Sequence, residues 1–513
     1  MASPPPQRRH EPVPGNPYAQ PVPAPRRRRA AVAVWVTAAV LVLAGVGGGL
    51  YAVTRGDDDS GGGGFREPAA RETRESARPP GSGERADGPG AAPVRRVDVN
   101  AGRKPGEARG WLALNDVRLP GKGALLNDLW TVDDLVVQAE YDQVTAYRVR
   151  GGEKAWTVRL PAPVCDSPVR ASPGGKVVLA LTNGNKTQGR KCDRLQQLDL
   201  RTGDLGWHRS LTAHGLEDST IIVHLAISGG TLAVGQGDVA HGYRVRDGKR
   251  LFTVKPKPTG PCSLQDVAGG ERLLLVDTCA PGAPRAHGQV KRIDPGTGEV
   301  RWRYRTETGW KVDKIYSVDP LVLAVRDTKT YENWAVVSVD GSGRQRARID
   351  LGRGRDAFEM CDGAGDAGEG VQNCPGGAVG DDRIYLPTKP ADGILGPNRV
   401  VAFDLATGRR AWSASVQGRQ LTPVRQSGAG RSGVVVYVRP DTGAPGRTVR
   451  FAATGGAPRT LLRHPTPARR WEADMFAGET LYSGGRLFVA PSRLNPKSLG
   501  GKKEQGRLVS YGR

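Results

Sequence analysis

The stretch that decides the fold is Ala402-Phe403-Asp404-Leu405-Ala406-Thr407-Gly408-Arg409-Arg410-Ala411-Trp412. Its pattern predicts a strand, a tight turn and a second strand, because Phe403 suits a half-buried strand and Trp412 opens the next one. Asp404 can accept hydrogen bonds from backbone N–H groups of the turn, and Gly408 supplies a positive φ without steric cost. One hairpin cannot bury both of its faces, so this stretch needs further copies of itself.

Copies of the stretch recur along the chain at regular spacing. Two copies keep the offsets in full, and they are Asp199, Thr202, Gly203, Trp207 and Asp294, Thr297, Gly298, Trp302. The turn glycines of all copies, which we call the marker glycines, are Gly152, Gly203, Gly248, Gly298, Gly343, Gly408 and Gly455. A period of about 40–50 residues that is rich in short strands is typical of propeller blades of four strands each.

The spacing A-x-D-x-x-T-G-x-x-x-W resembles the repeat of the pyrroloquinoline-quinone (PQQ) type, or quinoprotein-like, β-propellers, over residues 109–513. The resemblance implies that the aromatic residue after each turn docks between adjacent blades. The aromatic residues in this position are Trp156, Trp207, Phe252, Trp302 and Trp412. The constant place of Asp199, Asp294 and Asp404 before the turn indicates a structural role. Many members of the family bind no quinone.

The two ends of the repeat region predict how many blades there are. Residues 506–513 look like the strand before a marker turn, and residues 109–114 look like the strand after one. The two ends would therefore complete one blade together and remove the open sheet edges. We expect an all-β, eight-bladed β-propeller closed by pairing of its N- and C-terminal strands.

The chain before the repeats divides into three segments. Residues 1–29 are rich in Pro and Arg and are expected to form a disordered cytoplasmic tail. Residues 30–53 contain no charged residue, and this length suffices for a single transmembrane helix, since a bilayer needs about 20 residues. Residues 54–108 are rich in Gly, Pro and charged residues and are expected to be a flexible extracytoplasmic linker.

The charges that flank the apolar segment predict its orientation. Arg26 to Arg29 precede it and Asp57 to Asp59 follow it, so the basic side should stay in the cytoplasm and the propeller should lie outside. A cleaved signal peptide is the alternative, but its apolar region is usually only about 7–15 residues long. We therefore expect a single-pass protein of the cell membrane that contacts the lipid bilayer through residues 30–53.

The six cysteines lie outside the membrane in this topology, where disulfides persist. Six cysteines permit 15 pairings. Pairing of successive cysteines keeps each link within one blade and is the economical choice. The predicted disulfides are Cys165–Cys192, Cys262–Cys279 and Cys361–Cys374.

No residues in the sequence form a convincing catalytic, cofactor-binding or metal-binding site. There is no C-x-x-C, G-x-S-x-G, Walker or H-E-x-x-H motif. The quinone enzymes that the repeat resembles carry an adjacent cysteine pair near the cofactor, and this chain has no adjacent cysteines. We therefore expect no cofactor and no enzymatic activity.

The chain is basic, with 75 Lys and Arg against 52 Asp and Glu. Residues 1–29 hold six of the basic residues and one acidic residue, which leaves 69 against 51 and a net charge of +18 beyond the tail. Such a surface suits anionic polymers of the envelope or phospholipid headgroups, although a solvated basic surface is the simpler interpretation. Nucleic acid is not expected as a partner.

These features together predict a membrane-anchored module that binds or scaffolds a protein or an envelope polymer at a bacterial cell envelope. Two alternatives stay open. The first is a PQQ-dependent dehydrogenase, and the second is the ligand-sensing outer domain of a membrane signalling complex. Both rest on the fold, which by itself does not determine function.

Overall fold

The computed structural model describes residues 97–513 except 122, 184–190, 215–217, 258, 353–357, 360–369, 373, 375, 381, 392–395, 428–432, 476–477 and 497–503. The chain divides into two compact units, residues 1–90 and residues 91–513, and the description below concerns the second. The predicted cytoplasmic tail, the predicted transmembrane helix and the linker up to residue 96 lie outside the described residues. Within the described ranges, none of the helices has both the length and the apolar character needed to cross a membrane.

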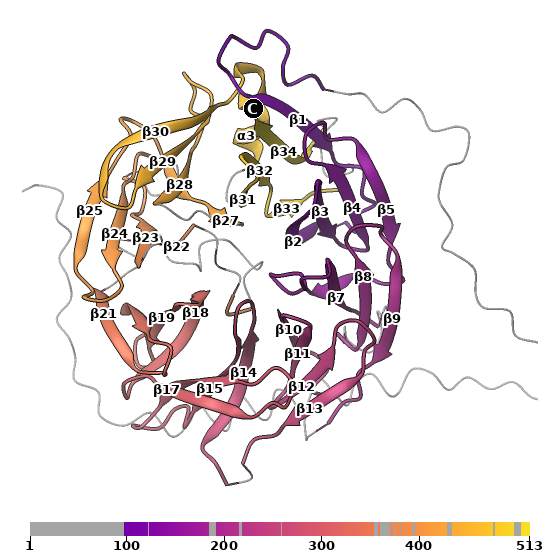
Figure 1. Ribbon diagram of the computed structural model, residues 1–513, viewed down its shortest axis with the longest axis vertical. Helices are drawn as coiled ribbons and strands as arrows, with labels where there is room; N and C mark the ends of the chain where they lie inside the picture. Colours follow the sequence, from indigo (N-terminus) through magenta and orange to yellow (C-terminus); the bar gives the residue numbers. More distant parts are fainter. Residues whose placement is uncertain are drawn as a thin grey trace, which may run out of the picture. The chain divides into compact units, whose positions relative to one another are not determined.

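The second unit consists of antiparallel groups of four main strands that stand radially around a common axis (Figure 1). In each group the strand nearest to the axis comes first in the sequence. The last group is the exception, because its outermost strand comes from the N-terminal end of the unit and its other strands come from the C-terminal end. The first three groups are β2 (Ala124–Val132), β3 (Leu135–Glu140), β4 (Gln143–Arg148) and β5 (Lys154–Arg159); β6 (Val164–Asp166), β7 (Lys176–Leu181), β8 (Arg194–Asp199) and β9 (Leu205–Ser210); and β10 (Val223–Ser228), β11 (Thr231–Gln236), β12 (Val239–Arg244) and β13 (Arg250–Val254).

The next groups continue in the same order around the axis. They are β14 (Cys262–Ala268), β15 (Leu273–Cys279), β16 (His287–Ile293) and β17 (Val300–Arg305); β18 (Trp310–Val318), β19 (Leu321–Asp327), β20 (Trp334–Val339) and β21 (Gln345–Gly352); β22 (Ala378–Gly380), β23 (Arg383–Pro387), β24 (Val400–Asp404) and β25 (Arg410–Ala414); and β26 (Leu421–Pro423), β28 (Val434–Val438), β29 (Arg447–Ala452) and β30 (Gly455–Arg463). One parallel pair, His287 with Trp310, links β16 to β18.

The last group joins strands from the two ends of the unit. Its strands are β31 (Glu479–Ser483), β32 (Arg486–Ala490), β34 (Gly506–Gly512) and β1 (Arg109–Leu114). β1 pairs antiparallel with β34, so that Leu112 lies opposite Val509. The short strands β27 (Arg425–Gln426) and β33 (Arg493–Leu494) add to β31 and β2, and the helices η2 (Thr466–Ala468) and α3 (Arg469–Asp474) precede β31.

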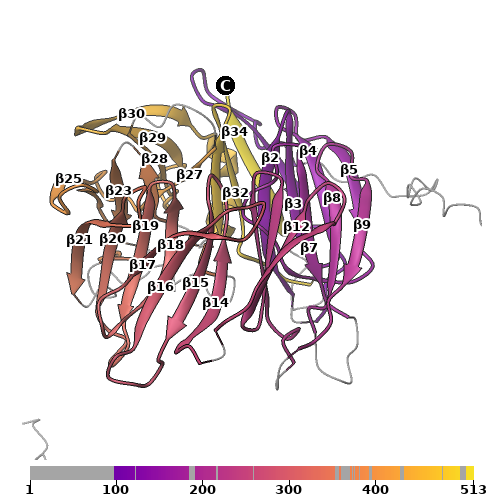
Figure 2. The same ribbon diagram turned by 60° about the horizontal axis from the view of Figure 1, so that its bottom comes forward.

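The middle strands are buried on both faces because a neighbouring sheet covers each face (Figure 2). In β7, Val177 and Leu179 pack into a cluster with residues of β3, while Val178 and Ala180 pack into a cluster with residues of β11. Successive side chains of a strand point to opposite faces. The strand must therefore be apolar at every position, which explains the uninterrupted run of Val, Leu and Ala.

The marker turns have the geometry that the sequence predicts. The Asp404 carboxylate accepts hydrogen bonds from the backbone N–H groups of Ala406 (3.0 Å) and Thr407 (2.9 Å). Gly408 has a φ of 72°, and the other six marker glycines also have positive φ. A left-handed backbone at this point suits glycine because it has no Cβ.

Every marker glycine except Gly408 also receives an aromatic ring, whereas Gly408 lies against Ala347 and the backbone of Arg348. A Cβ placed on Gly203 would lie 2.8 Å from the ring of Trp156, and one on Gly455 would lie 2.8 Å from the ring of Trp412. The indole Nε1 of Trp412 donates to the carbonyl of Ala453 at 2.8 Å. Each ring thus packs flat on a glycine and links one sheet to the next.

These docked aromatic residues are buried to different degrees. The four predicted tryptophans, Trp156, Trp207, Trp302 and Trp412, are half-buried, since they lie on the outermost strands. Phe252 is buried, and so is Trp111 on β1, which packs against Gly152 in the same manner. Trp111 was not predicted to dock because no marker turn precedes it in the sequence.

The folded unit also extends further toward the N-terminus than the predicted boundary at residue 109. Val99 and Ala108 are buried in the same apolar cluster as Val509 and Tyr511. Asn100 exchanges two side-chain hydrogen bonds of 2.8 Å with the backbone of Gly110. The last residues assigned to the flexible linker are therefore part of the packed domain.

Candidate axial binding site

A cavity of about 690 Å³ opens where the innermost strands of four consecutive sheets meet. Its walls are formed by β2, β6, β10, β14 and the segment 370–372. We call the opening of this cavity the axial mouth. The sequence pattern predicts no role for any residue on these inner strands other than the pairing of two cysteines.

Charged side chains occupy an equivalent position on most of the inner strands. In each case the residue lies opposite a small or β-branched residue on the second strand, and the pairs are Asp128–Ala139, Asp166–Ala180, His224–Gly235, Asp266–Val276, Lys314–Ala324 and Glu479–Ala490. We call these six residues the charged layer. Paired residues project from the same face of a sheet, so a short side chain on the second strand leaves room for the charged one.

Irregular pairing accompanies four members of the charged layer. The register shifts by one residue just before Asp128, Asp166, Asp266 and Lys314. Such a β-bulge bends the strand and changes the direction of a side chain, and bulges are frequent next to functional sites. Asp128, Asp166, His224 and Asp266 all line the axial cavity.

Backbone N–H groups bind the three aspartates of the cavity. Asp166 accepts from Leu225 at 2.6 Å, and Asp266 accepts from Val267 and Val371 at 2.6 Å each. The Nδ1 atom of His224 lies 3.8 Å from an Asp266 carboxylate oxygen. These bonds fix the carboxylates while leaving part of their accepting capacity unused.

Basic side chains form ion pairs with some carboxylates of the charged layer and not with others. Arg425 on β27 forms ion pairs with both Asp128 and Glu479. The Nζ atom of Lys314 donates to the carbonyl of Gly370 at 2.7 Å. Asp166 forms no ion pair within the described ranges, so it is the least compensated carboxylate of the layer.

The pKa values of the aspartates reflect this environment. Burial raises the pKa of Asp166 well above its usual value, and the neighbouring Asp266 raises it further. Burial also raises the pKa of Asp128, with Glu479 adding to the effect, and it raises the pKa of Asp266 against the opposing influence of His224. A carboxyl group in this state favours a proton or another cation nearby.

Two exposed isoleucines stand at the axial mouth. Ile221 and Ile222 each have 59% of their surface exposed, and both line the cavity. We call this pair the isoleucine lip. Adjacent exposed isoleucines are unusual on a protein surface and are typical of a contact site.

The disulfide Cys165–Cys192 holds the isoleucine lip in place. Its Cα atoms are 6.0 Å apart, and both cysteines line the cavity. The backbone N–H of Cys192 donates to the carbonyl of Thr220 at 2.7 Å, directly before the lip. Lys191 binds Asp218 at 2.5 Å and fixes the start of the same loop.

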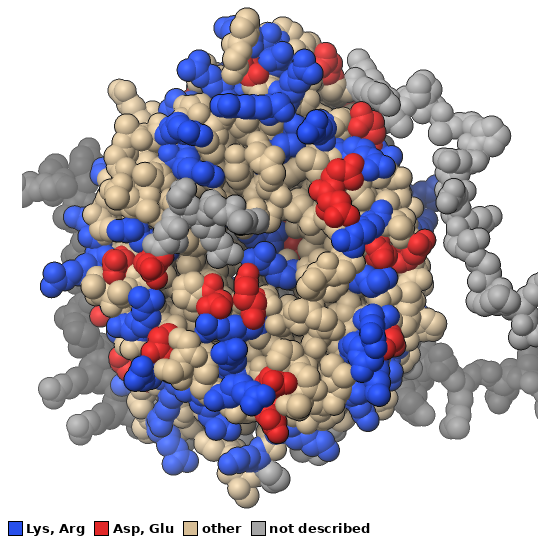
Figure 3. Space-filling view, viewed as in Figure 1, with Lys and Arg blue, Asp and Glu red and all other residues tan. Residues whose placement is uncertain are grey.

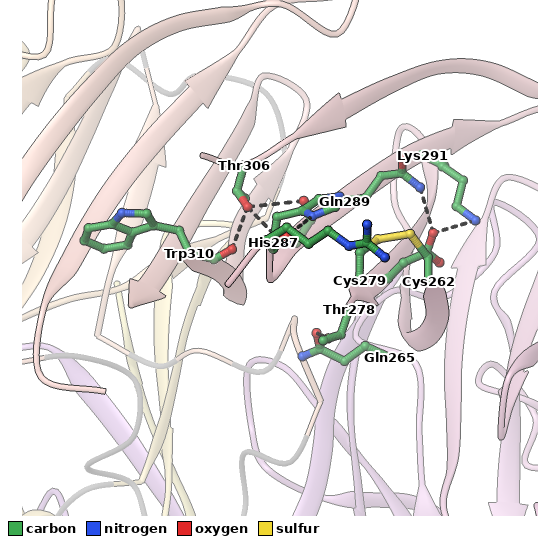
Figure 4. The surroundings of a disulfide bond; sticks show 12 residues. Cys262, Gln265, Thr278, Cys279, His287, Gln289, Lys291, Thr306 and Trp310 are labelled. Carbon is green, nitrogen blue, oxygen red and sulfur yellow. Dashed lines mark hydrogen bonds and ion pairs between the residues drawn. A yellow bond between two sulfur atoms is a disulfide. The ribbon is translucent and has the colours of Figure 1, made fainter. Parts of the chain in front are cut away.

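The second predicted disulfide, Cys262–Cys279, is also present; it links the innermost strand β14 to β15 and is not part of the cavity wall (Figure 4). His287 lies beside it, and these three residues are the one group in the described part whose atoms are close enough to share a metal ion. The disulfide occupies both sulfur atoms, so one ligand remains. The third predicted pair, Cys361–Cys374, lies outside the described residues because Cys361 does.

The described residues do not fit a quinone centre with its calcium ion. The adjacent cysteine pair is missing from the sequence, and the axial carboxylates are not among the groups that could share one metal ion. A hard cation such as Ca²⁺ takes six to eight oxygen ligands. The site, as far as the described residues show it, is a cavity with spaced carboxylates and an apolar lip.

The sheets around an axis and the marker repeat together define a β-propeller of the PQQ type. A family model described as outer membrane protein assembly factor BamB matches residues 94–270 and 286–455. The chain belongs to this family. A search of curated proteins gave no match.

Several solved structures are similar to this chain at low sequence identity. BamB from Moraxella catarrhalis is 15% identical, with 78% of this chain and 100% of that chain covered and a TM-score of 0.42. The quinohemoprotein alcohol dehydrogenase ADHIIG from Pseudomonas putida is 13% identical, with 79% and 76% covered and a TM-score of 0.45. The computationally designed Ika8 protein is 12% identical, with 78% and 100% covered and a TM-score of 0.45.

Proposed function

We propose that this chain is a binding or scaffolding module that holds a protein partner at the outer side of a cell membrane. Residues 30–53 anchor it as a single-pass helix with the N-terminus in the cytoplasm, and the linker that follows carries an eight-bladed propeller closed by β1 and β34. The name of the matching family, an assembly factor, agrees with binding to a protein rather than with catalysis.

The composition of the axial mouth supports the proposal most directly. One opening combines a cavity of about 690 Å³, exposed apolar residues, and buried carboxylates, Asp128 and Asp266, with raised pKa. Binding sites are typically concave, with apolar walls and a few polar groups that fix the orientation of the ligand. The end face that Figure 3 shows carries Lys and Arg in groups, with fewer Asp and Glu between them, and such groups would suit the anionic-polymer contact predicted from net charge.

A photo-crosslinking amino acid at position 222 tests the proposed binding face in intact cells. We expect a covalent adduct with an exported or membrane protein, because the side chain of Ile222 is exposed at the mouth. The matched control is position 205, since Leu205 is also an exposed apolar residue but lies on the outer strand β9. Equal adducts at both positions, or none at 222, would contradict the proposal.

Protease treatment tests the proposed anchoring. Protease added to intact cells stripped of their wall should digest the chain beyond about residue 55 and spare residues 1–29. Digestion of the tail with survival of the propeller would show the opposite orientation.

A further inference from the structure

We infer that the axial mouth takes a basic side chain, arginine or lysine, from a polypeptide partner. The charged end would lie within the charged layer, and the apolar residues that flank it in the partner would lie on the isoleucine lip. This inference rests on the proposed function, because it names what the partner presents to the mouth.

The charge of the cavity selects a cationic ligand. Arg425 is shared between Asp128 and Glu479, and Lys314 is directed to the carbonyl of Gly370. Asp166 is half-buried and lines the cavity, where its carboxylate accepts a hydrogen bond from the backbone N–H of Leu225 at 2.6 Å. An entering cation would therefore find an uncompensated carboxylate on the cavity wall, where low polarity strengthens the attraction.

Other cations that line the cavity do not fill this role. Lys191 is engaged by Asp218 in the loop that carries the lip. Arg493 lies on β33 opposite Leu125, three residues before Asp128, and so it stands at the rim rather than in the charged layer. His224 Nδ1 lies 3.8 Å from an Asp266 carboxylate oxygen, which is too far for a hydrogen bond.

The spacing of the carboxylates favours an extended organic cation over a metal ion. Within the described residues, no three axial carboxylate or imidazole groups come close enough to bind one ion together. A guanidinium has five N–H donors spread over a plane and can reach separate acceptors at the same time. The apolar stem of arginine or lysine also packs well along apolar walls such as those of the mouth.

The contrast between the cavity and the outer surface adds selectivity. The chain beyond residue 29 carries a net charge of +18, so a basic partner is repelled by most of the surface. A partner that presents its basic residue to the acidic cavity gains a favourable contact there. Complementary charge of this kind contributes specificity more than overall affinity.

Two blocked peptides that differ in one atom group test the inference. The first contains Leu-Arg-Leu and the second contains Leu-citrulline-Leu, in which a neutral urea replaces the guanidinium. Fluorescence anisotropy with the purified domain should show saturable binding of the arginine peptide and binding at least tenfold weaker for the citrulline peptide. No saturable binding of the arginine peptide, or equal binding of the two, would overturn the inference.

Variants of the domain separate this inference from the proposed function. Asp166→Asn should weaken the arginine peptide about tenfold and leave the citrulline peptide unchanged, while Lys314→Gln should tighten it because it removes a competing charge. Asp350→Asn is the control, since this exposed carboxylate lies on the outer strand β21. If crosslinking at Ile222 succeeds but Asp166→Asn binds the arginine peptide normally, the mouth is a docking site in which Asp166 does not hold the cation, and this inference fails while the proposed function stands.

Discussion

Aspartates at the outer turns and at the axis of this propeller have opposite electrostatic states. Asp294 lies in a marker turn, where bonds from Arg301 and from two backbone N–H groups lower its pKa to about 2. Asp166 lies at the axis, where burial and a second carboxylate raise its pKa. The turn aspartate stabilises the folded state. The axial aspartate destabilises it, which is useful only if its carboxylate binds a ligand.

The largest expected effect concerns the junction between β1 and β34. Arg507 is fully buried on β34 and forms ion pairs with Glu140 and Asp116, and burial raises the pKa of Glu140 to about 7 although Arg507 opposes this. Deleting residues 506–513 removes these contacts and leaves Glu140 buried without its cation. We expect the truncated domain not to fold, as judged by circular dichroism and thermal unfolding.

Deletion of residues 60–90 is the control for that truncation. It shortens the linker without touching Val99 or Asn100, which belong to the packed domain. Its melting temperature should equal that of the intact protein. A truncated protein that melts at the normal temperature would mean that the ring is closed by other contacts and that eight is the wrong number of blades.

The aromatic contacts should show a graded effect. Trp111 is buried and its Nε1 donates to the carbonyl of Val149 at 2.9 Å, so Trp111→Ala should cost about 3–5 kcal/mol, as for other buried large-to-small changes. Trp302 is half-buried, and its Nε1 has no hydrogen-bond partner among the described residues. Trp302→Ala should therefore cost less in urea unfolding, and an equal cost at both positions would contradict the difference in packing.

The disulfide beside the mouth links stability to binding. Replacing Cys165 and Cys192 by serine opens a loop of 27 residues, which the chain-entropy model values at about 3 kcal/mol. We also expect loss of crosslinking at Ile222, because the lip depends on this bond. The corresponding change at Cys262 and Cys279 should destabilise the domain without affecting the crosslink, and loss of crosslinking in both variants would remove the special role of the first disulfide.

The smallest effect that we expect is a pH-dependent change in stability, which has opposite signs for the axial aspartate and for the turn aspartate. Asp166→Asn should stabilise the free domain at pH 7, because the raised pKa of Asp166 means that its ionised carboxylate lowers the free energy of unfolding. The folded state holds the proton of Asp166 more tightly than the unfolded state does, so wild-type stability is lost as pH rises above about 4. The gain from Asp166→Asn should therefore vanish near pH 4 in thermal unfolding experiments.

Asp294→Asn should do the reverse in the same experiment. Its carboxylate stabilises the fold above the pKa of the unfolded state, about 3.9, and this contribution is lost as pH falls toward 2. The variant should melt below the wild type at pH 7 and approach it in acid. Two variants with shifts of the same sign at pH 7 would contradict the comparison between axis and turn.

The same comparison explains what could be predicted from the sequence. The outer turns repeat Asp, Thr, Gly and Trp at constant offsets because the turn and the glycine contact impose the same geometry on each copy. The inner strands carry Asp, Glu, His or Lys at the equivalent position, so no single residue type identifies this position in the sequence. A usable signal exists, since Asp128, His224, Asp266 and Lys314 each lie seven residues before the first residue of the next strand. The lip was not predictable, because its exposure depends on a loop and a disulfide rather than on a repeat.

Isothermal titration calorimetry of the arginine peptide in two buffers of different ionisation enthalpy tests the central claim most directly. If the axial carboxylates are partly protonated and bind the cation, binding near pH 5 must release protons, and the observed heat must differ between the buffers. The account predicts this release in the wild type and its reduction in Asp166→Asn. Binding with the same heat in both buffers would contradict the claim that the axial carboxylates form the binding site.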